Sequence, residues 1–279
     1  MRQRSVRPVA GACACGQAGG VPPDLDFLQY AVVIALIDAV RYLLVVGIGY
    51  LLLDRRGRRT RPHRKIEPRP AVTADVRREL LCSARTVLVF GLVGACVFTA
   101  SRHGYTRLYF DVHRHGAGWF AASVLLTILI HDSYFYWTHR LMHTRLLFKA
   151  VHSLHHRSTN PTAWAAYSFS VPEALIQAGI FPLVACVLPI HPFAFATFML
   201  FQIAENTLGH AGYEIFPRWL LRTPLGALTN TPTHHVQHHQ VFDANFGIYF
   251  NVWDRLLGTN HPDYARRFEE VTARPRPSA

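Results

Sequence analysis

The apolar residues of this chain are gathered into long blocks rather than spread evenly. Residues 27–53 are interrupted only by Asp38 and Arg41, and they exceed the roughly 20 residues that a helix needs to cross a bilayer. We expect a transmembrane helix here, with further candidates at residues 86–100, 119–136, 171–190 and 192–208. Proline and glutamate interrupt the last two, which favours kinked or re-entrant helices. The predicted fold class is an all-α integral membrane protein with about four transmembrane helices plus interfacial or re-entrant ones.

The formal net charge of +12 raises the possibility of nucleic-acid binding. The distribution of the charge argues against it, because the densest basic cluster directly follows the first apolar block. Cytoplasmic loops of membrane proteins carry such an excess of basic residues. We interpret the cluster as a topology signal or a contact with anionic lipid, and expect no nucleic-acid partner. Its members are Arg55, Arg56, Arg58, Arg59, Arg61, Arg64 and Lys65.

Histidines form three short boxes, HRLMH, HSLHH and HVQHH. Residues three and four apart share a face of an α-helix, so each box is expected to present its imidazoles as one row. A single ion takes about four to six ligands of this kind, so eight histidines indicate two metal ions. The residues are His139 and His143, then His152, His155 and His156, then His235, His238 and His239.

The candidate spans also predict where these boxes lie. If the basic loop is cytoplasmic, counting spans along the chain brings all three boxes and His210 to that same side of the membrane. His103, His113 and His115 then fall on the opposite side, so we do not expect them to bind the metal ions.

Several residues near the boxes are candidates to contact a ligand or to add one. Asp132 lies two turns before His139 and could accept its second ring N–H, the usual arrangement for metal-bound histidine. His131 is either an interfacial histidine or a ligand. Glu173 is expensive in lipid and should pair with a box histidine or a nearby arginine. Further candidates are His210, which is four residues after Asn206, His234 before the third box, and Asp243 and Asn245 after it.

The segments HDSYFYWTHRLMH, HSLHHRSTNPTAWAAYSFSVPEA, NTLGHAGYEIFP and THHVQHHQVFDANFGIYFNVWDRLLGT closely resemble the fatty acid hydroxylase and sterol desaturase superfamily of integral-membrane, non-haem di-iron enzymes. The resemblance covers residues 125–260. Some members have a histidine where this chain has Asn206, so one coordination place would fall to water, to this amide or to His234. The resemblance implies as metal ligands His139, His143, His152, His155, His156, His210, His235, His238 and His239, with no catalytic side chain beyond them.

The same resemblance implies two Fe ions, O2 as co-substrate and an external electron donor of the cytochrome b5 or ferredoxin type. The expected reaction is hydroxylation or desaturation of an unactivated C–H bond in a fatty acyl, sterol or other isoprenoid-type lipid. Two alternatives stay open: a membrane protein that binds or transports a divalent metal, and a zinc-dependent membrane hydrolase.

Four regions are predicted along the chain. A disordered tail covers residues 1–24, a membrane region with a basic loop at 54–80 covers 25–125, a catalytic domain under a cytoplasmic histidine cap covers 126–262, and a polar tail covers 263–279.

Overall fold

The computed structural model describes residues 24–276, which form helices and isolated bridges but no β-strand. The predicted all-α membrane class is confirmed, because three of these helices are long and apolar enough to cross a bilayer. Nearly all of the tail predicted at residues 1–24 lies outside the described residues.

The first helix is longer than its apolar block. Helix α1 (Phe27–Gly49) begins at Asp26, whose side chain accepts a hydrogen bond from Gln29 N. The helix continues through a π-helical turn (Tyr50–Arg55) into α2 (Arg56–Thr60). The helix therefore extends beyond residue 53, where the apolar block ends. Arginine is a good helix former, so the basic residues extend the helix rather than ending it.

Two more long helices, α3 (Thr73–Arg102) and α4 (Gly116–Met142), complete the set that meets the length and composition of a span. The candidate at residues 171–190 is divided into α5 (Val171–Ala178) and α6 (Ile180–Val187) around Gly179. Pro182 explains the interruption, because it has no N–H to donate to the residue four positions earlier. Helix α7 (Pro192–His210) follows and ends in polar residues.

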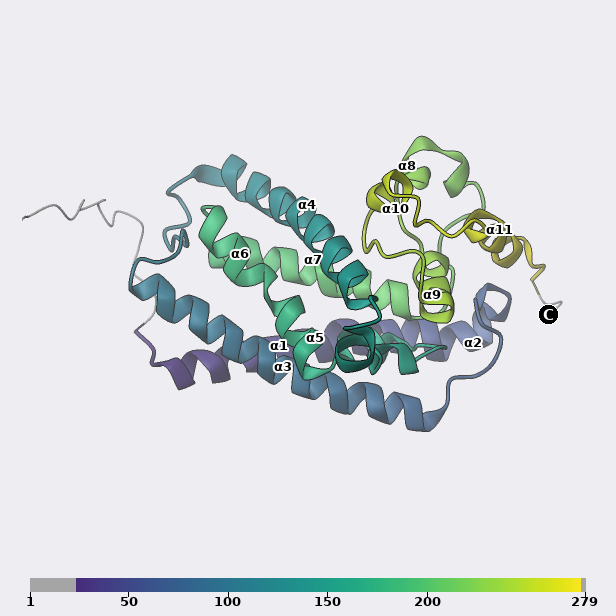
Figure 1. Cartoon of the computed structure of the whole chain (residues 1–279), viewed down its shortest axis with the longest axis horizontal. Helices are drawn as coiled ribbons and strands as arrows, with labels where there is room; N and C mark the ends of the chain where they lie inside the picture. The colour runs from purple at the N-terminus through teal and green to yellow at the C-terminus, as the bar shows by residue number, and fades with distance from the viewer. Residues whose placement is uncertain (1–23, 277–279) are drawn as a thin grey trace, which may run out of the picture.

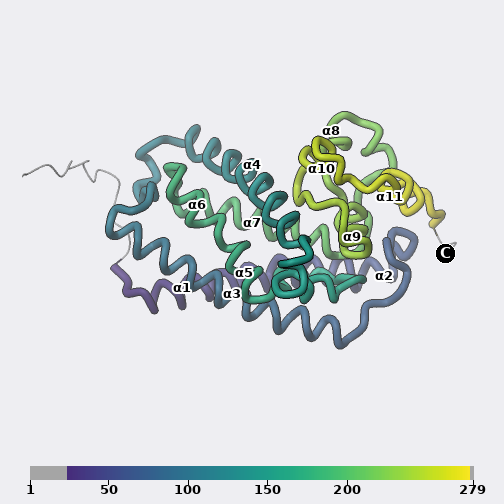
Figure 2. The backbone as a smooth tube through the Cα atoms, in the orientation of Figure 1, coloured from purple at the N-terminus to yellow at the C-terminus, as the bar shows by residue number. Residues whose placement is uncertain are grey.

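Helices α1 and α3 run side by side, while α4, α6 and α7 pack above them, as Figures 1 and 2 show. Helices α8 (Pro224–Ala227), α9 (Pro232–Val241), α10 (Val252–Leu256) and α11 (Tyr264–Ala273) gather in a cap beyond the ends of α4 and α7 (Figure 1). The histidine-bearing segments therefore meet at one end of the helix bundle.

The outward faces of the long helices are apolar. Leu36, Leu43 and Leu44 on α1 and Leu88 on α3 are each more than half exposed. Such a continuous apolar surface is unfavourable in water and suits the hydrocarbon interior of a bilayer.

The C-terminal segment is more ordered than a polar tail. Residues 264–273 form α11, in which Tyr264, Phe268 and Val271 are buried. Their spacing of four and three residues is that of an amphipathic helix, and α11 packs against α9. It thereby covers the histidine-bearing helix from outside.

We expect Gly91→Ala to destabilise the fold, because α1 and α3 approach closely there. A methyl group at Gly91 would lie 2.7 Å from the carbonyl oxygen of Ala31 and 2.8 Å from the Cβ of Ala35. Overpacking of this kind costs about 1–3 kcal/mol. The thermal unfolding midpoint in detergent should fall, whereas Gly118→Ala, which meets nothing within 4 Å, should leave it unchanged or raise it. Equal midpoints for both variants would contradict the expectation.

Candidate metal centre

Nine histidines from distant parts of the chain form two groups at the cap end of the bundle. Within each group, the side-chain nitrogen atoms that can bind a metal lie within 4.8 Å of one another. The first group contains His139, His143, His152, His156 and His238, and the second contains His155, His210, His235 and His239.

The groups do not correspond to the boxes. The second box is not one α-helical face: His152 ends a π-helical turn (Phe148–His152), while His155 and His156 begin a 3-10 turn (His155–Arg157). Adjacent histidines therefore point to different groups. The predicted single row holds only in part for the third box, where His235 and His239, four apart on α9, share the second group while His238 joins the first.

The Nε2 atoms converge at short distances. In the first group, Nε2 of His152 lies 3.1 Å from that of His139, and Nε2 of His156 lies 3.1 Å from those of His143 and His238. In the second group, Nε2 of His210 lies 3.0–3.3 Å from those of the other three histidines. Nitrogen ligands about 2.1 Å from a shared ion stand about 3 Å apart, so the spacing suits metal coordination.

The opposite ring nitrogen fixes the tautomer of several of these histidines. The Nδ1 atoms of His139, His238 and His210 donate to the carbonyl oxygens of Phe246, Ala244 and Asn206 at 2.8, 2.6 and 2.8 Å. A neutral imidazole that donates from Nδ1 has a lone pair on Nε2. Convergent lone pairs repel one another unless a cation lies between them, so the donor set fits metal ions in both groups.

The histidines outside the membrane-spanning helices are also held neutral. Burial, followed by the neighbouring imidazoles, lowers the pKa values of His152, His155 and His156 well below 6.5. The same causes lower the pKa values of His235 and His239. Neutral imidazole is the form that binds metal.

Glu173 pairs with a box histidine, as the sequence predicts. Its Oε1 lies 2.7 Å from Nδ1 of His152, and both side chains are buried. A carboxylate in this place orients the ring and increases the basicity of Nε2.

The predicted pairing of Asp132 with His139 is wrong. Asp132 Oδ1 accepts hydrogen bonds from the backbone N–H groups of Tyr249 and Phe250, both at 3.1 Å, while His139 donates to Phe246. The backbone carbonyl of Phe246, in a loop of the cap, occupies the position beside His139 that was expected for Asp132. Spacing along one helix cannot predict a contact with such a distant loop.

Four other candidates lie outside the two groups. His131 faces Tyr249, whose hydroxyl is 2.9 Å from its Nδ1. His234 is buried on another face of α9, against Tyr264 and 3.6 Å from Asp254, so it does not substitute as a ligand. Asp243 is exposed. The side-chain amide of Asn206 donates to the backbone carbonyl of Ala166, and the backbone carbonyl of Asn206 orients His210.

The loop after α9 holds in place the backbone carbonyl groups of Ala244 and Phe246, which accept from the histidines. The carboxylate of Asp254 accepts hydrogen bonds from the N–H groups of Phe246 and Gly247 at 2.9 and 2.7 Å. Asn245 does not touch the grouped histidines; its amide bonds the carbonyl of His234 and the side chain of Gln237. The orienting carbonyls of Ala244 and Phe246 carry no sequence signal, because any residue could supply them.

A cavity of about 350 Å³ lies among the membrane-level helices. Its wall is mostly apolar and is formed by residues of α1, α3, α4, α5, α6 and α7. Phe169 belongs to this wall, and its ring centroid is 5.4 Å from that of His155. The cavity therefore extends to the edge of the second histidine group.

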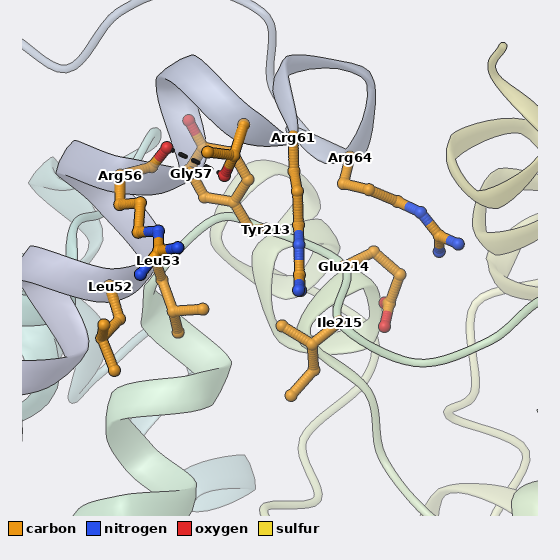
Figure 3. Close-up of a pocket in the computed structure, with 10 residues that line it drawn as sticks. Leu52, Leu53, Arg56, Gly57, Arg61, Arg64, Tyr213, Glu214 and Ile215 are labelled. Atoms are coloured by element: carbon orange, nitrogen blue, oxygen red, sulfur yellow. Dashed lines mark hydrogen bonds between the residues drawn. The ribbon is translucent and has the colours of Figure 1, made fainter. Parts of the chain in front are cut away.

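A second hollow, of about 410 Å³, lies where α1 leaves the apolar region. Figure 3 shows Arg56 and Arg61 at this hollow, with Leu52 and Leu53 on the same side as Arg56. Tyr213, three residues after the ligand candidate His210, completes the wall. The basic cluster thus lies at the same end of the bundle as the histidines.

These features define an α-helical membrane protein with two buried histidine clusters suited to metal ions. Residues 124–259 match the fatty acid hydroxylase family. The chain is also similar to sterol desaturases and to lathosterol oxidase.

Three relatives illustrate the range of similarity. Over 198 residues the chain is 29% identical to the Delta(7)-sterol 5(6)-desaturase ERG3B of Gibberella zeae, covering 71% of this chain and 60% of the relative. It is 29% identical to lathosterol oxidase of Rattus norvegicus, covering 67% and 62%. It is 30% identical to the very-long-chain aldehyde decarbonylase GL1-5 of Oryza sativa subsp. indica, covering 54% and 26%.

The match to the two sterol enzymes thus spans about three fifths of their length. No solved structure matches the chain.

We expect the protein to bind two transition-metal ions, and the two groups to respond differently to the loss of a ligand. His143→Ala leaves four histidines in the first group, which is enough for a stable site, whereas His235→Ala leaves three in the second. Elemental analysis after purification should give nearly two ions per chain for His143→Ala and fewer for His235→Ala. The exposed His113 provides the control, since His113→Ala should retain both ions. Equal losses in both ligand variants would contradict the assignment.

The metal-free protein should lose stability in acid. The unfolded chain binds protons at a histidine pKa near 6.5, whereas the folded pKa values are well below this. Stability is therefore retained above pH 6.5 and falls as the pH decreases, by up to about 1.4 kcal/mol per pH unit for each histidine. Thermal unfolding between about pH 7.5 and 5.5 measures this slope. His238→Gln should flatten it, and a midpoint that rises in acid would contradict it.

Proposed function

We propose that this protein is a membrane-bound di-iron oxygenase that hydroxylates or desaturates an unactivated C–H bond of a lipid. The observation that supports this most strongly is the junction of two convergent histidine groups with an apolar cavity at membrane depth. The names of the similar proteins, sterol desaturases and a lathosterol oxidase, favour a lipid substrate.

The proposed metal ligands are the nine grouped histidines, five for one iron ion and four for the other. When bound, the two iron ions supply the oxidation of the C–H bond by O2, with electrons from an external donor, which no side chain can supply. The protein holds the ligands through Glu173 and the carbonyls of Ala244 and Phe246, so that the rings keep their orientation.

The cavity would hold the lipid and exclude water. Phe169 lies between the cavity and His155, so it would direct one part of the substrate toward the second group. The long helices leave the other walls apolar, and a lipid could enter from the bilayer without crossing a polar surface.

The histidine end of the bundle is proposed to face the cytoplasm. Arg56, Arg61 and Arg64 lie at that end and border the hollow in Figure 3. Basic residues next to a span favour the cytoplasmic side. A soluble electron donor of the cytochrome b5 or ferredoxin type would then reach the cap directly from water.

The test is product formation by iron-loaded protein in liposomes that contain host lipids and a reduced ferredoxin. Oxidised lipid should form only when both oxygen and reductant are present. Incorporation of one oxygen atom from isotopically labelled O2 would identify hydroxylation, and loss of two hydrogen atoms would identify desaturation. The His155→Ala/His239→Ala variant should form no product, because it leaves the second group incomplete.

Two results would contradict the proposal. Lipid turnover by zinc-loaded protein without oxygen would favour a hydrolase, and metal flux across the liposome membrane without any lipid product would favour a transporter.

A further inference from the structure

The apolar cavity contains a small set of polar side chains that metal binding does not use. They come from four different helices but line the same space. The members are Asp38 and Arg41 on α1, His131 on α4, Gln177 on α5 and Gln202 on α7.

Asp38 and Arg41 form an ion pair within the first membrane-spanning helix. Their side chains are only 7% and 12% exposed. Charged residues at membrane depth are costly, and a buried ion pair is often no more stable than well-packed apolar residues of similar size. Helix packing alone therefore gives little reason for this pair, and its place in a cavity wall indicates a ligand.

The other polar side chains of the set are held in place by their neighbours. Gln202 accepts at 3.2 Å from the hydroxyl of Tyr167, which fixes the orientation of its amide. His131 is fixed by the hydroxyl of Tyr249, which lies 2.9 Å from its Nδ1. The cavity thus offers a donor, Arg41, and an acceptor, Asp38, side by side in an otherwise mostly apolar wall.

The charge of the pair limits what can bind. Asp38 and Arg41 neutralise each other, so the site has no net charge to attract a carboxylate or a phosphate. A hydroxyl group can donate to the carboxylate and accept from the guanidinium at the same time. The carboxylate of Asp38 would repel an anionic headgroup at this site.

The polar set lies at a fixed depth below the metal centre. His131 is eight residues before His139 on α4, and Gln202 is eight residues before His210 on α7. Both separations correspond to about 12 Å along a helix. A lipid held at this depth would present a carbon remote from its polar group to the histidines, past Phe169.

We propose that Asp38 and Arg41, supported by Gln202, bind an uncharged hydroxyl group of the lipid substrate within the membrane and thereby select lipid alcohols. The inference rests on the proposed function, because it assigns one end of the substrate in the same cavity.

The experiment compares binding of lipids that differ only in the polar group. Iron-loaded protein in detergent is titrated with cholestanol and cholestane, and separately with hexadecanol, hexadecane and palmitate, in competition with a radiolabelled lipid alcohol. The variant is Asp38→Leu/Arg41→Met, which removes both charges together and leaves no lone buried charge. The control is Arg222→Met/Glu269→Leu, which removes an exposed ion pair of the cap.

Wild-type protein should prefer the alcohol to the matched alkane by about tenfold or more in at least one series. The Asp38→Leu/Arg41→Met variant should bind both equally while keeping the wild-type iron content, and the control should keep the preference. An unchanged preference in the variant, or a wild-type preference for palmitate, would overturn the inference.

Iron content and oxygen-dependent product are measured on the same samples and test the proposed function separately. Lipid oxidation without any preference for the alcohol would overturn only the inference. A protein that neither retains iron nor oxidises lipid would overturn the proposed function.

Discussion

The mutual repulsion of nine imidazole lone pairs is the constraint around which the cap is built. Bringing Nε2 atoms to about 3 Å from one another is unfavourable unless a cation joins them. The protein holds several of these rings by giving the opposite nitrogen a fixed partner, as the Nδ1 atoms of His139 and His238 show. The carbonyls and Glu173 therefore do as much to define the site as the histidines themselves.

Holding the carbonyls requires unusual backbone conformations. Helix α9 ends at Phe242, whose φ of 67° is left-handed, and Asn245 has a φ of 62°. Each left-handed residue other than glycine costs of order 1–3 kcal/mol. This conformation turns the chain back so that Ala244 and Phe246 face the histidines, and Asp254 fixes the turn from behind. The strain lies where the site needs the backbone to reverse direction.

The sequence predicts the nine clustered histidines but not their division into groups. Spacing within HSLHH suggests one helical face, yet a π turn and a 3-10 turn send His155 and His156 in different directions. Asp132 shows the same limit, since seven residues along a helix predict a contact that a distant loop has taken. Hydropathy locates the long helices well, and the prolines of residues 171–190 predict an interrupted helix there, which the structure places at Gly179.

The cap and the membrane-level part of the bundle differ in their chemical surroundings, and the same helices connect them. At the cap, the carboxyl group of Glu173 and the backbone carbonyl groups of Ala244 and Phe246 hold the histidines. At membrane depth α7 lines the cavity mostly with apolar side chains, and α4 contributes His131. Because one continuous helix carries both His131 and His139, the distance from membrane depth to the metal ligands is set by helix geometry rather than by a flexible loop. A rigid spacing of this kind is what a site needs to act at one carbon of a long, uniform lipid.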